Sequence, residues 1–267
     1  MRAAALFVLL APALAAADDN DPCANTVDDP VSTPVRDVML DTQRAACVRQ
    51  DLSAGVLAHA LIDTPGFYGT LGGDLALGGR LVLHTHYELN AQVRLVDVAF
   101  VQNAVTKTTH AGAGPITIGA VAERAIGSGA RGALVAQLEL PYTRDNMETV
   151  HVSGQLTAVV TGRLADAWLL HARLGAVAMA ASSLGGDTDR IALRAGADIV
   201  WQLRTSISLQ AGAEASAGWY HGFDHLLLRA AVHWRMADRW RLLAGLGAPT
   251  FGDERTNAVL DIGIARD

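Results

Sequence analysis

The stretch from Leu226 to Leu246, LLLRAAVHWRMADRWRLLAGL, constrains the fold most, because apolar residues occupy every second position on both sides of a short break. The positions between them carry Arg229, His233, Arg235 and Arg241. An alternation of period two is typical of β-strands with one apolar and one polar face. The break, MADR, has the length of a hairpin turn, and a Trp stands on the apolar face on each side of it. We therefore predict a β-hairpin whose apolar face contacts lipid, with aromatic side chains at the membrane interface.

The start of the chain has the features of a secretory signal peptide. Met1-Arg2 supplies positive charge, Ala3–Leu14 is apolar, and Ala15–Ala17 is a small-residue cleavage site. The apolar run is too short to cross a bilayer as a helix. We predict that residues 1–17 are a signal peptide, and that the protein is exported to the outer membrane of a Gram-negative cell.

Residues 18–50 differ in character from the rest of the chain, because they are acidic and contain proline. Thr33 as N-cap and apolar residues at helical spacing predict a short helix near Pro34–Arg49. This segment would lie in the periplasm or plug the barrel; the alternative is an ordinary, partly disordered leader. Cys23 and Cys47 are predicted to form a disulfide in an oxidising compartment, the alternative being two buried or unpaired thiols.

The period-two alternation recurs through residues 51–267, which are predicted to form a single β-domain. The hydrophobic content of 51% is never gathered into a membrane-spanning helix, and strands with one lipid-facing side explain it. We predict an all-β, antiparallel, up-and-down transmembrane β-barrel of about twelve strands, ten being possible. Its expected short turns lie near residues 89, 127, 165, 204 and 237. Its expected longer connections lie near residues 63–79, with Gly66–Gly79 as a loop, and near 102–114, 142–149, 180–189, 215–224 and 249–256. A slip in the alternation near Asp97 predicts a β-bulge.

Composition excludes one class of partner and raises one difficulty. The net charge of −6 leaves no polybasic surface for nucleic acid. The aromatic content of 5% is low for a membrane barrel, so the position of each aromatic residue matters. Five aromatic residues fall on apolar faces close to short turns and predict a membrane-interface girdle: Tyr87, Trp168, Trp201, Trp234 and Trp240. The alternative is that they close the core of a soluble β-protein.

The polar faces of the predicted strands would line the barrel lumen. Such a charged lining needs water or internal ion pairs, so an open path and a closed salt-bridge network both remain possible. The residues predicted to line the lumen and to influence selectivity are His84, His86, Glu88, Arg94, Glu139, His151, His171, Arg173, Arg194, Asp198, Arg229, His233, Arg235 and Arg241. The same face receives Glu123, Gln137, Gln155, Gln202, Glu214 and Asp261.

Motifs for catalysis, metals or cofactors are weak. His84 and His86 share one strand face and could chelate a metal, but lumen polarity explains them better, so we predict no metal site. His151 and Ser153 partly resemble the His-x-Ser-Asn pattern of outer-membrane phospholipase and lipid A deacylases, although Gly154 replaces the Asn and both side chains are expected to face inward. No cofactor motif is present, and we expect no catalytic residues.

Two units, RLADAWLLHARLG at Arg163–Gly175 and RMADRWRLLAGLG at Arg235–Gly247, are similar to the recurring turn-and-strand unit of twelve-stranded porin-like and transporter families. The resemblance implies an outer-membrane β-barrel and names no substrate. We expect a passive channel or small-solute transporter in contact with outer-membrane lipid. The sequence does not determine the number of subunits. The alternatives are a closed structural or surface-interaction barrel, an outer-membrane lipid hydrolase, and a soluble periplasmic barrel.

Overall fold

The structure is a computed structural model. It describes residues 46–48, 51–63, 68–102, 107–114, 116–127, 129–140, 150–183, 186–204, 206–218, 222–237, 240–252 and 258–266. The strands are β1 (Asp51–Asp63), β2 (Tyr68–His84), β3 (Tyr87–Gln102), β4 (Lys107–Gly112), β5 (Ile116–Ala125), β6 (Ala130–Leu140), β7 (Val150–Ala165), β8 (Trp168–Ser183), β9 (Gly186–Arg204), β10 (Ile207–Gly218), β11 (Gly222–Ala237), β12 (Trp240–Gly252) and β13 (Ala258–Arg266). In these residues we find no helix with the length and apolar character that a membrane span requires.

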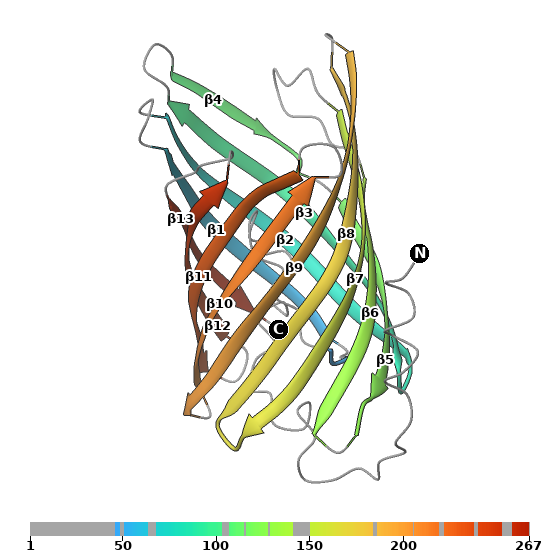
Figure 1. The fold of residues 1–267 in the computed structure, drawn as a ribbon. Helices are drawn as coiled ribbons and strands as arrows, with labels where there is room; N and C mark the ends of the chain where they lie inside the picture. Colours follow the sequence, from blue (N-terminus) through green and yellow to red (C-terminus); the bar gives the residue numbers. More distant parts are fainter. Residues whose placement is uncertain are drawn as a thin grey trace.

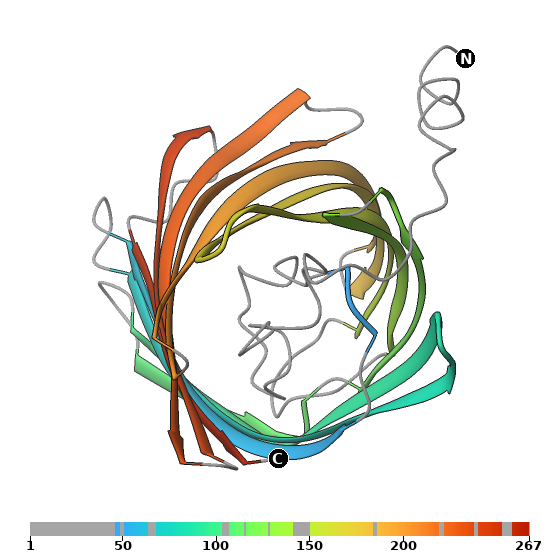
Figure 2. The same ribbon diagram turned by 90° about the horizontal axis from the view of Figure 1, so that it is seen from below.

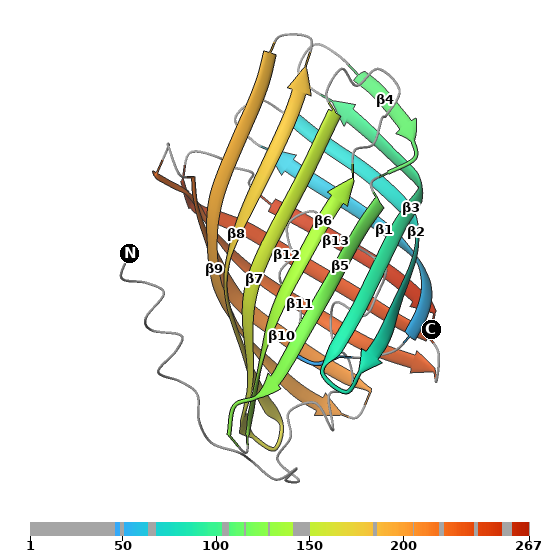
Figure 3. The same cartoon turned by 90° about the vertical axis from the view of Figure 1, so that its right-hand side faces the viewer.

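The strands close into a barrel (Figures 1 and 2). Neighbouring strands pair antiparallel around the sheet, and β1 closes the ring by pairing with both β13 and β2. β4 and β5 take one place in the ring, because β3 pairs with β4 through Asp97–Gln102 and with β5 through Tyr87–Val93. The result is a closed antiparallel barrel of twelve strands, which confirms the predicted architecture. Figure 3 shows the common tilt of β5 to β8 across one side of the wall.

The hairpin predicted at Leu226–Leu246 is present. β11 and β12 pair in register, with Trp234 opposite Leu242 and Val232 opposite Ala244. The apolar side chains at even-numbered positions, such as Leu228, Val232 and Leu246, are exposed on the outside. The odd-numbered positions are buried on the inside and include Leu227, Ala231 and Leu243 as well as Arg229, His233 and Arg241. The even-numbered and odd-numbered positions therefore lie on opposite faces of the wall, as the alternation indicated.

Two predicted connections are wrong in the first third of the barrel. Residues Gly66–Gly79 were expected to form a loop, but from Tyr68 onward they belong to β2 and pair with β1 and β3. The glycines concealed an alternation of Leu71, Leu75, Leu77 and Leu81, all of which are exposed on the outside. The turn expected near residue 89 lies at residues 85–86 instead.

Several predicted long connections are shorter than expected, because the strands continue into them. β8 ends at Ser183 and β9 begins at Gly186, and β9 alone has 19 residues. About 9–11 residues suffice for a tilted strand to cross a bilayer, so this hairpin extends beyond that thickness. The region 102–114 contains β4, and the pairing of β2 with β3 shifts next to Leu95, close to the bulge expected near Asp97. Residues 141–149 lie outside the described part.

The helix predicted near Pro34–Arg49 is wrong at its C-terminal end, where Ala46–Val48 are not helical. The backbone N–H groups of Ala46 and Val48 donate to side chains of the barrel wall instead of to carbonyls of a preceding helical turn. The rest of the predicted helix lies outside the described residues. Cys47 is buried. Its predicted partner Cys23 lies outside the described residues, so the disulfide stays a prediction.

Candidate functional site

A cluster of charged side chains lies on the inward face of β8 to β11, and we call it the ion-pair cluster. It consists of Arg173 on β8, Asp198 on β9, Glu214 on β10 and Arg229 on β11, each between 1% and 6% exposed. Arg229 binds Asp198 in a bidentate manner: Nε donates to Oδ1 over 2.8 Å and Nη2 to Oδ2 over 2.7 Å. Planar fork geometry of this kind is the strongest pairing available to a guanidinium group and a carboxylate.

Arg173 and Glu214 complete the ion-pair cluster. Arg173 Nη1 donates to Asp198, and its Nε donates to Glu214 Oε2 over 3.2 Å. Arg229 Nη1 lies 3.5 Å from the same Glu214 oxygen. The cluster thus has two positive and two negative charges. Because each charge faces an opposite charge from another strand, the desolvation cost of burial is offset.

Two glycines make room for the ion-pair cluster on the inner wall. A Cβ added at Gly212 would collide with Asp198 Oδ1 and with the backbone oxygen of Ala197. A Cβ at Gly196 would lie 2.7 Å from Arg173 Nη2. Side chains of the cluster therefore lie along the wall, over positions that need glycine.

Two histidines flank the ion-pair cluster on the same face. His171 is opposite Asp198 in the pairing of β8 with β9, and its Nδ1 lies 2.9 Å from Thr161 Oγ1. His233 Nε2 lies 3.2 Å from Gln210 Oε1. Both histidines are buried, 2% and 4% exposed. The network of polar side chains therefore extends from β7 to β11.

A second region of the inner wall, on β5 to β7, is apolar. The buried side chains Val121, Ala133, Val135 and Val159 form a cluster that we call the inner apolar patch. Residues Ala46–Val48, which we call the anchor, lie against it within the ring of strands (Figure 2). Ala46, with no measurable exposure, is part of the same cluster.

Hydrogen bonds fix the anchor to the wall. The Ala46 N–H donates to Thr161 Oγ1 over 2.8 Å, and the Val48 N–H donates to Glu123 Oε2 over 2.7 Å. Glu123 also accepts a hydrogen bond from Arg131. A buried backbone N–H needs a partner, and the barrel supplies one to each end of the anchor.

The predicted lumen residues fall into three groups. The structure buries Glu88, Arg94, His171, Arg173, Asp198, Arg229, His233 and Arg241. Glu139 and Arg194 are half-buried on the same face as buried neighbours. His84, His86 and Arg235 are exposed next to the short turns, and the side chain of His151 is outside the described part.

Among the candidate reactive residues whose side chains the structure describes, none assemble into a centre. The rings of His84 and His86 lie 6.4 Å apart and are exposed, whereas Glu88 is buried. Among the described side chains there is no group of three His, Cys, Asp or Glu residues that could hold a metal ion. Ser153 lies opposite Glu139 on the inward-facing side of β7, so its hydroxyl points away from the lipid-facing surface.

Sequence reasoning missed part of the inner wall. It overlooked several buried polar side chains. Most of them share parity with residues that were predicted to face inward, and this signal could have identified them: Arg80, Thr117, Thr161, Ser208, Gln210 and Ser216. Arg80 follows Gly66–Gly79, the expected loop, whereas the structure places it within β2. The inner apolar patch was not predicted, because only polar residues were used to identify inward-facing positions and the patch consists of valines and an alanine.

The outer surface carries the aromatic residues of the expected girdle. Tyr87, Trp168, Trp201, Trp234 and Trp240 are between 39% and 55% exposed, close to the short turns. Trp168 and Trp201 are opposite each other on β8 and β9 and stack in parallel, with ring centroids 5.2 Å apart. Offset or stacked aromatic pairs contribute beyond the area that they bury.

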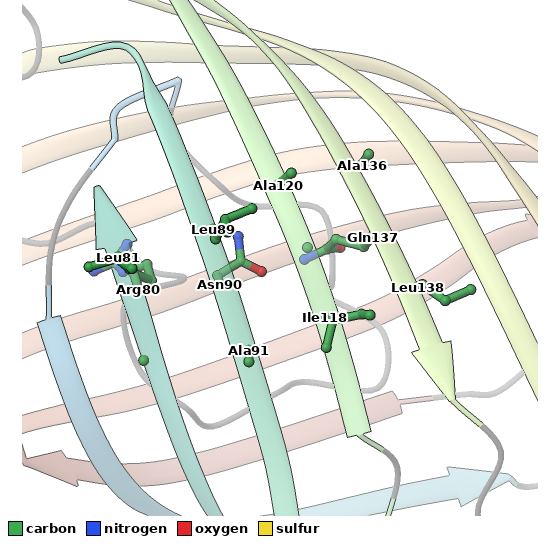
Figure 4. A pocket seen from close by; sticks show the side chains of 12 residues that line it. Arg80, Leu81, Leu89, Asn90, Ala91, Ile118, Ala120, Ala136, Gln137 and Leu138 are labelled. Atoms are coloured by element: carbon green, nitrogen blue, oxygen red, sulfur yellow. The ribbon is translucent and has the colours of Figure 1, made fainter. Parts of the chain in front are cut away.

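The outer surface also holds an apolar depression across β2, β3, β5 and β6 (Figure 4). Its volume is about 790 Å³. Small side chains, including Ala91 and Ala120, lie between larger ones such as Leu81, Ile118 and Leu138. Because this depression is on the apolar outside of the wall, it suits a hydrocarbon chain and not a polar solute.

No family model and no curated protein matches the chain. Among solved structures, it is similar to the COG4313 outer membrane channel from Pseudomonas putida F1, with a TM-score of 0.61 and 14% identity over 82% of this chain and 95% of that one. The β domain of the Bordetella autotransporter BrkA follows with a TM-score of 0.55 and 12% identity, over 81% and 98%. The KdgM porin, in complex with oligogalacturonate, has a TM-score of 0.53 and 9% identity, over 80% and 98%. The chain therefore has the barrel fold that is found in outer-membrane channels and porins.

Proposed function

We propose that the protein is an outer-membrane channel or small-solute transporter in which inward-facing charged side chains set selectivity. One observation carries the proposal: a closed ring of twelve strands exposes apolar residues outside and places charged residues inside. A barrel of this type satisfies every backbone group within lipid and leaves its interior for solutes or side chains.

The comparisons support the same class of function. The COG4313 protein is an outer membrane channel, and KdgM is a porin whose structure holds an oligogalacturonate. The barrel of this chain covers most of the length of both proteins.

The inner wall suggests a preference for anions. On the inward face, the described side chains include more arginines, namely Arg80, Arg94, Arg131, Arg163, Arg173, Arg194, Arg229 and Arg241, than carboxylates, namely Glu88, Glu123, Glu139, Asp198 and Glu214. An excess of positive charge along a low-dielectric path raises the local concentration of anions. We therefore expect small anionic solutes to pass more readily than cations of the same size.

Single-channel recording in planar bilayers tests the proposal. The full-length barrel should conduct, and its reversal potential in a KCl gradient should have the sign of an anion-selective pore. Arg194→Gln should move that potential towards zero, because Arg194 lies on the inward face. Arg124→Gln is the matched control, because Arg124 is exposed on the opposite face from the buried Glu123 and should leave the potential unchanged. Cation selectivity in the unmodified protein would contradict the preference.

A closed barrel that acts through its outer connections is the second candidate. The internally balanced ion-pair cluster and the anchor favour it, since both fill part of the interior. The closed barrel predicts no conductance in the unmodified protein or in any variant that weakens the anchor. Recovery of the folded protein from the aqueous fraction without detergent would overturn both membrane candidates.

A further inference from the structure

The outer depression on β2, β3, β5 and β6 has a defined rim and floor (Figure 4). Two pairs of large side chains form the rim: Leu81 is opposite Leu89, and Ile118 is opposite Leu138. These four side chains are between 38% and 52% exposed. Between the two pairs the floor consists of small residues, namely Gly79, Ala91, Ala120 and Ala136. The depression is therefore open to the surroundings of the barrel, and within a membrane its apolar lining favours hydrocarbon.

The floor of the depression continues towards the short-turn end of the barrel. Leu89 on β3 is opposite Ala120 on β5, and two residues closer to the turns Tyr87 is opposite Ala122. Side chains two residues apart lie on the same face of a strand. Ala122 is exposed and as small as Ala120, so the depression leads to the aromatic girdle at Tyr87.

A cation lies at the end of this path. Arg124 follows Ala122 on the outward face of β5 and is exposed, whereas Glu123 between them is buried on the inside. The Glu123 N–H donates to the carbonyl of His86 over 2.8 Å, which places the end of β5 beside the turn between β2 and β3. An arginine on the lipid face is costly at the bilayer midplane but is tolerated near the interface, where its side chain reaches the headgroups.

The hairpin of β2 and β3 adds hydrogen-bonding side chains beside Arg124. His84 and His86 are exposed, and the ring of His84 lies 6.4 Å from the rings of both His86 and Tyr87. Thr85 Oγ1 lies 3.1 Å from His84 Nδ1. Guanidinium, imidazole and hydroxyl groups all donate hydrogen bonds to phosphate oxygens, and the guanidinium group adds a full positive charge. Positive charge and hydrogen-bond donors therefore meet at the point where the depression ends.

The distance from the cation to the far rim of the depression fits one leaflet of a bilayer. Ile118 precedes Arg124 by six residues, which is about 20 Å along a strand. For a strand tilted by about 40°, this length corresponds to a depth of about 15 Å, half of the ~30 Å hydrocarbon core. A lipid with its phosphate at Arg124 would therefore lay an acyl chain along the depression within its own leaflet.

We propose that this part of the outer wall is a binding site for an anionic phospholipid. The phosphate binds Arg124 beside His84 and His86, and one acyl chain fills the depression between the two rim pairs. Charge-assisted hydrogen bonds to the guanidinium group hold the headgroup, and the apolar floor holds the chain. The proposal rests on the barrel and its outer surface, and it does not depend on whether the interior conducts.

Native mass spectrometry of the full chain in detergent tests the site, with dioleoyl-phosphatidylglycerol as the probe and dioleoyl-phosphatidylcholine for comparison. The first molecule of phosphatidylglycerol should bind more tightly than phosphatidylcholine. Arg124→Gln should weaken this binding by about fivefold. Arg124→Lys should weaken it by about twofold or less, because lysine keeps the charge. Ala120→Phe should weaken it by about tenfold, because the ring occupies the floor of the depression.

Two control variants match these substitutions. Lys107→Gln removes an exposed cation at the opposite end of the barrel, where Lys107 pairs with Gln102. Ala230→Phe fills a second outer depression, of about 620 Å³, which Trp168 and Trp201 line. Neither control should weaken the binding of the first phosphatidylglycerol. Heat-dependent migration on a gel verifies that every variant is a folded barrel, and Arg124→Gln tests the site if Ala120→Phe does not fold.

Three results would overturn the proposal. The first is equal binding of the two lipids, and the second is equal binding by the unmodified protein and Arg124→Gln. The third is a dimer that Ala120→Phe dissociates, since this face would then be an interface between copies of the chain. Bilayer recording answers the question of conduction separately, because Arg124 faces away from the lumen.

Discussion

The side chains in two regions of the inner wall are buried by different means. On β8 to β11 the ion-pair cluster places charge against charge, and all its partners come from the wall itself. On β5 to β7 the inner apolar patch is covered by the anchor, a piece of chain from outside the wall. The first region is complete once the strands pair, whereas the second needs a further segment. The comparison separates a part of the interior that the wall stabilises by itself from a part that depends on contact with the anchor.

The largest effect is expected in the ion-pair cluster. Asp198→Ala removes the carboxylate that both Arg173 and Arg229 bind and leaves two buried guanidinium groups against Glu214 alone. The free energy of unfolding should fall by about 3–5 kcal/mol, as for other broken buried ion pairs. Urea unfolding in detergent, followed by Trp fluorescence, measures this change. Asp166→Ala, in an exposed turn, should change it by about 0.5 kcal/mol or less.

The glycines under the ion-pair cluster give the next largest effect. Gly212→Ala forces a methyl group into Asp198 and the backbone of β9 and should lower the free energy of unfolding by about 1–3 kcal/mol. Gly154→Ala is the matched control, because the nearest atom to its added Cβ is 3.9 Å away. Equal loss of stability in the two variants would show that the ion-pair cluster does not depend on space at Gly212.

A smaller effect, of a different kind, is expected at the anchor. Thr161→Val leaves the Ala46 N–H without its acceptor and should lower the free energy of unfolding by about 1 kcal/mol. Unlike the substitutions above, it should also loosen the anchor and speed amide hydrogen exchange at Ala46. Thr157→Val, on the same face of β7, should not speed this exchange. If the Ala46 amide exchanged at the same rate in both variants, the contrast between the two regions would be lost.

The smallest effect is expected at Arg131, whose side chain is 22% exposed. Arg131→Gln removes its ion pair with Glu123, and partial exposure limits the loss to about 1 kcal/mol or less. Glu123 keeps the hydrogen bond from the Val48 N–H, so amide hydrogen exchange at Val48 should not become faster. Faster exchange at Val48 would show that the anchor depends on this ion pair.

Strand periodicity made most of the barrel predictable. The alternation around Trp234 and Trp240 correctly indicated the β11–β12 hairpin and the face that each residue occupies. The same reasoning failed between Gly69 and Gly79, because glycine has neither a polar nor an apolar side chain to reveal its face. In this barrel such glycines belong to the wall.

The partners within the interior were not predictable from the sequence. Parity placed Arg173 and Asp198 inward, but strand register and tilt decide that Arg229, three strands away from Arg173, shares the same carboxylate. The anchor is harder still, because it joins a backbone N–H to Thr161 across a separation of 115 residues. A hydrogen bond donated by a backbone N–H requires no particular residue type at the donor position, so the sequence does not indicate it.

The pairing of β1 with β13 has a consequence for biogenesis. Its register runs from Ala54 opposite Arg266 to Ile62 opposite Ala258, so the first and last strands of the wall form a seam. Contacts between such distant parts of a chain form late, because the closure entropy of the whole intervening chain must be overcome first. Until the last strand arrives, β1 and β12 present open edges that can pair with other chains. A barrel with such a seam therefore needs protection from aggregation until the seam has formed.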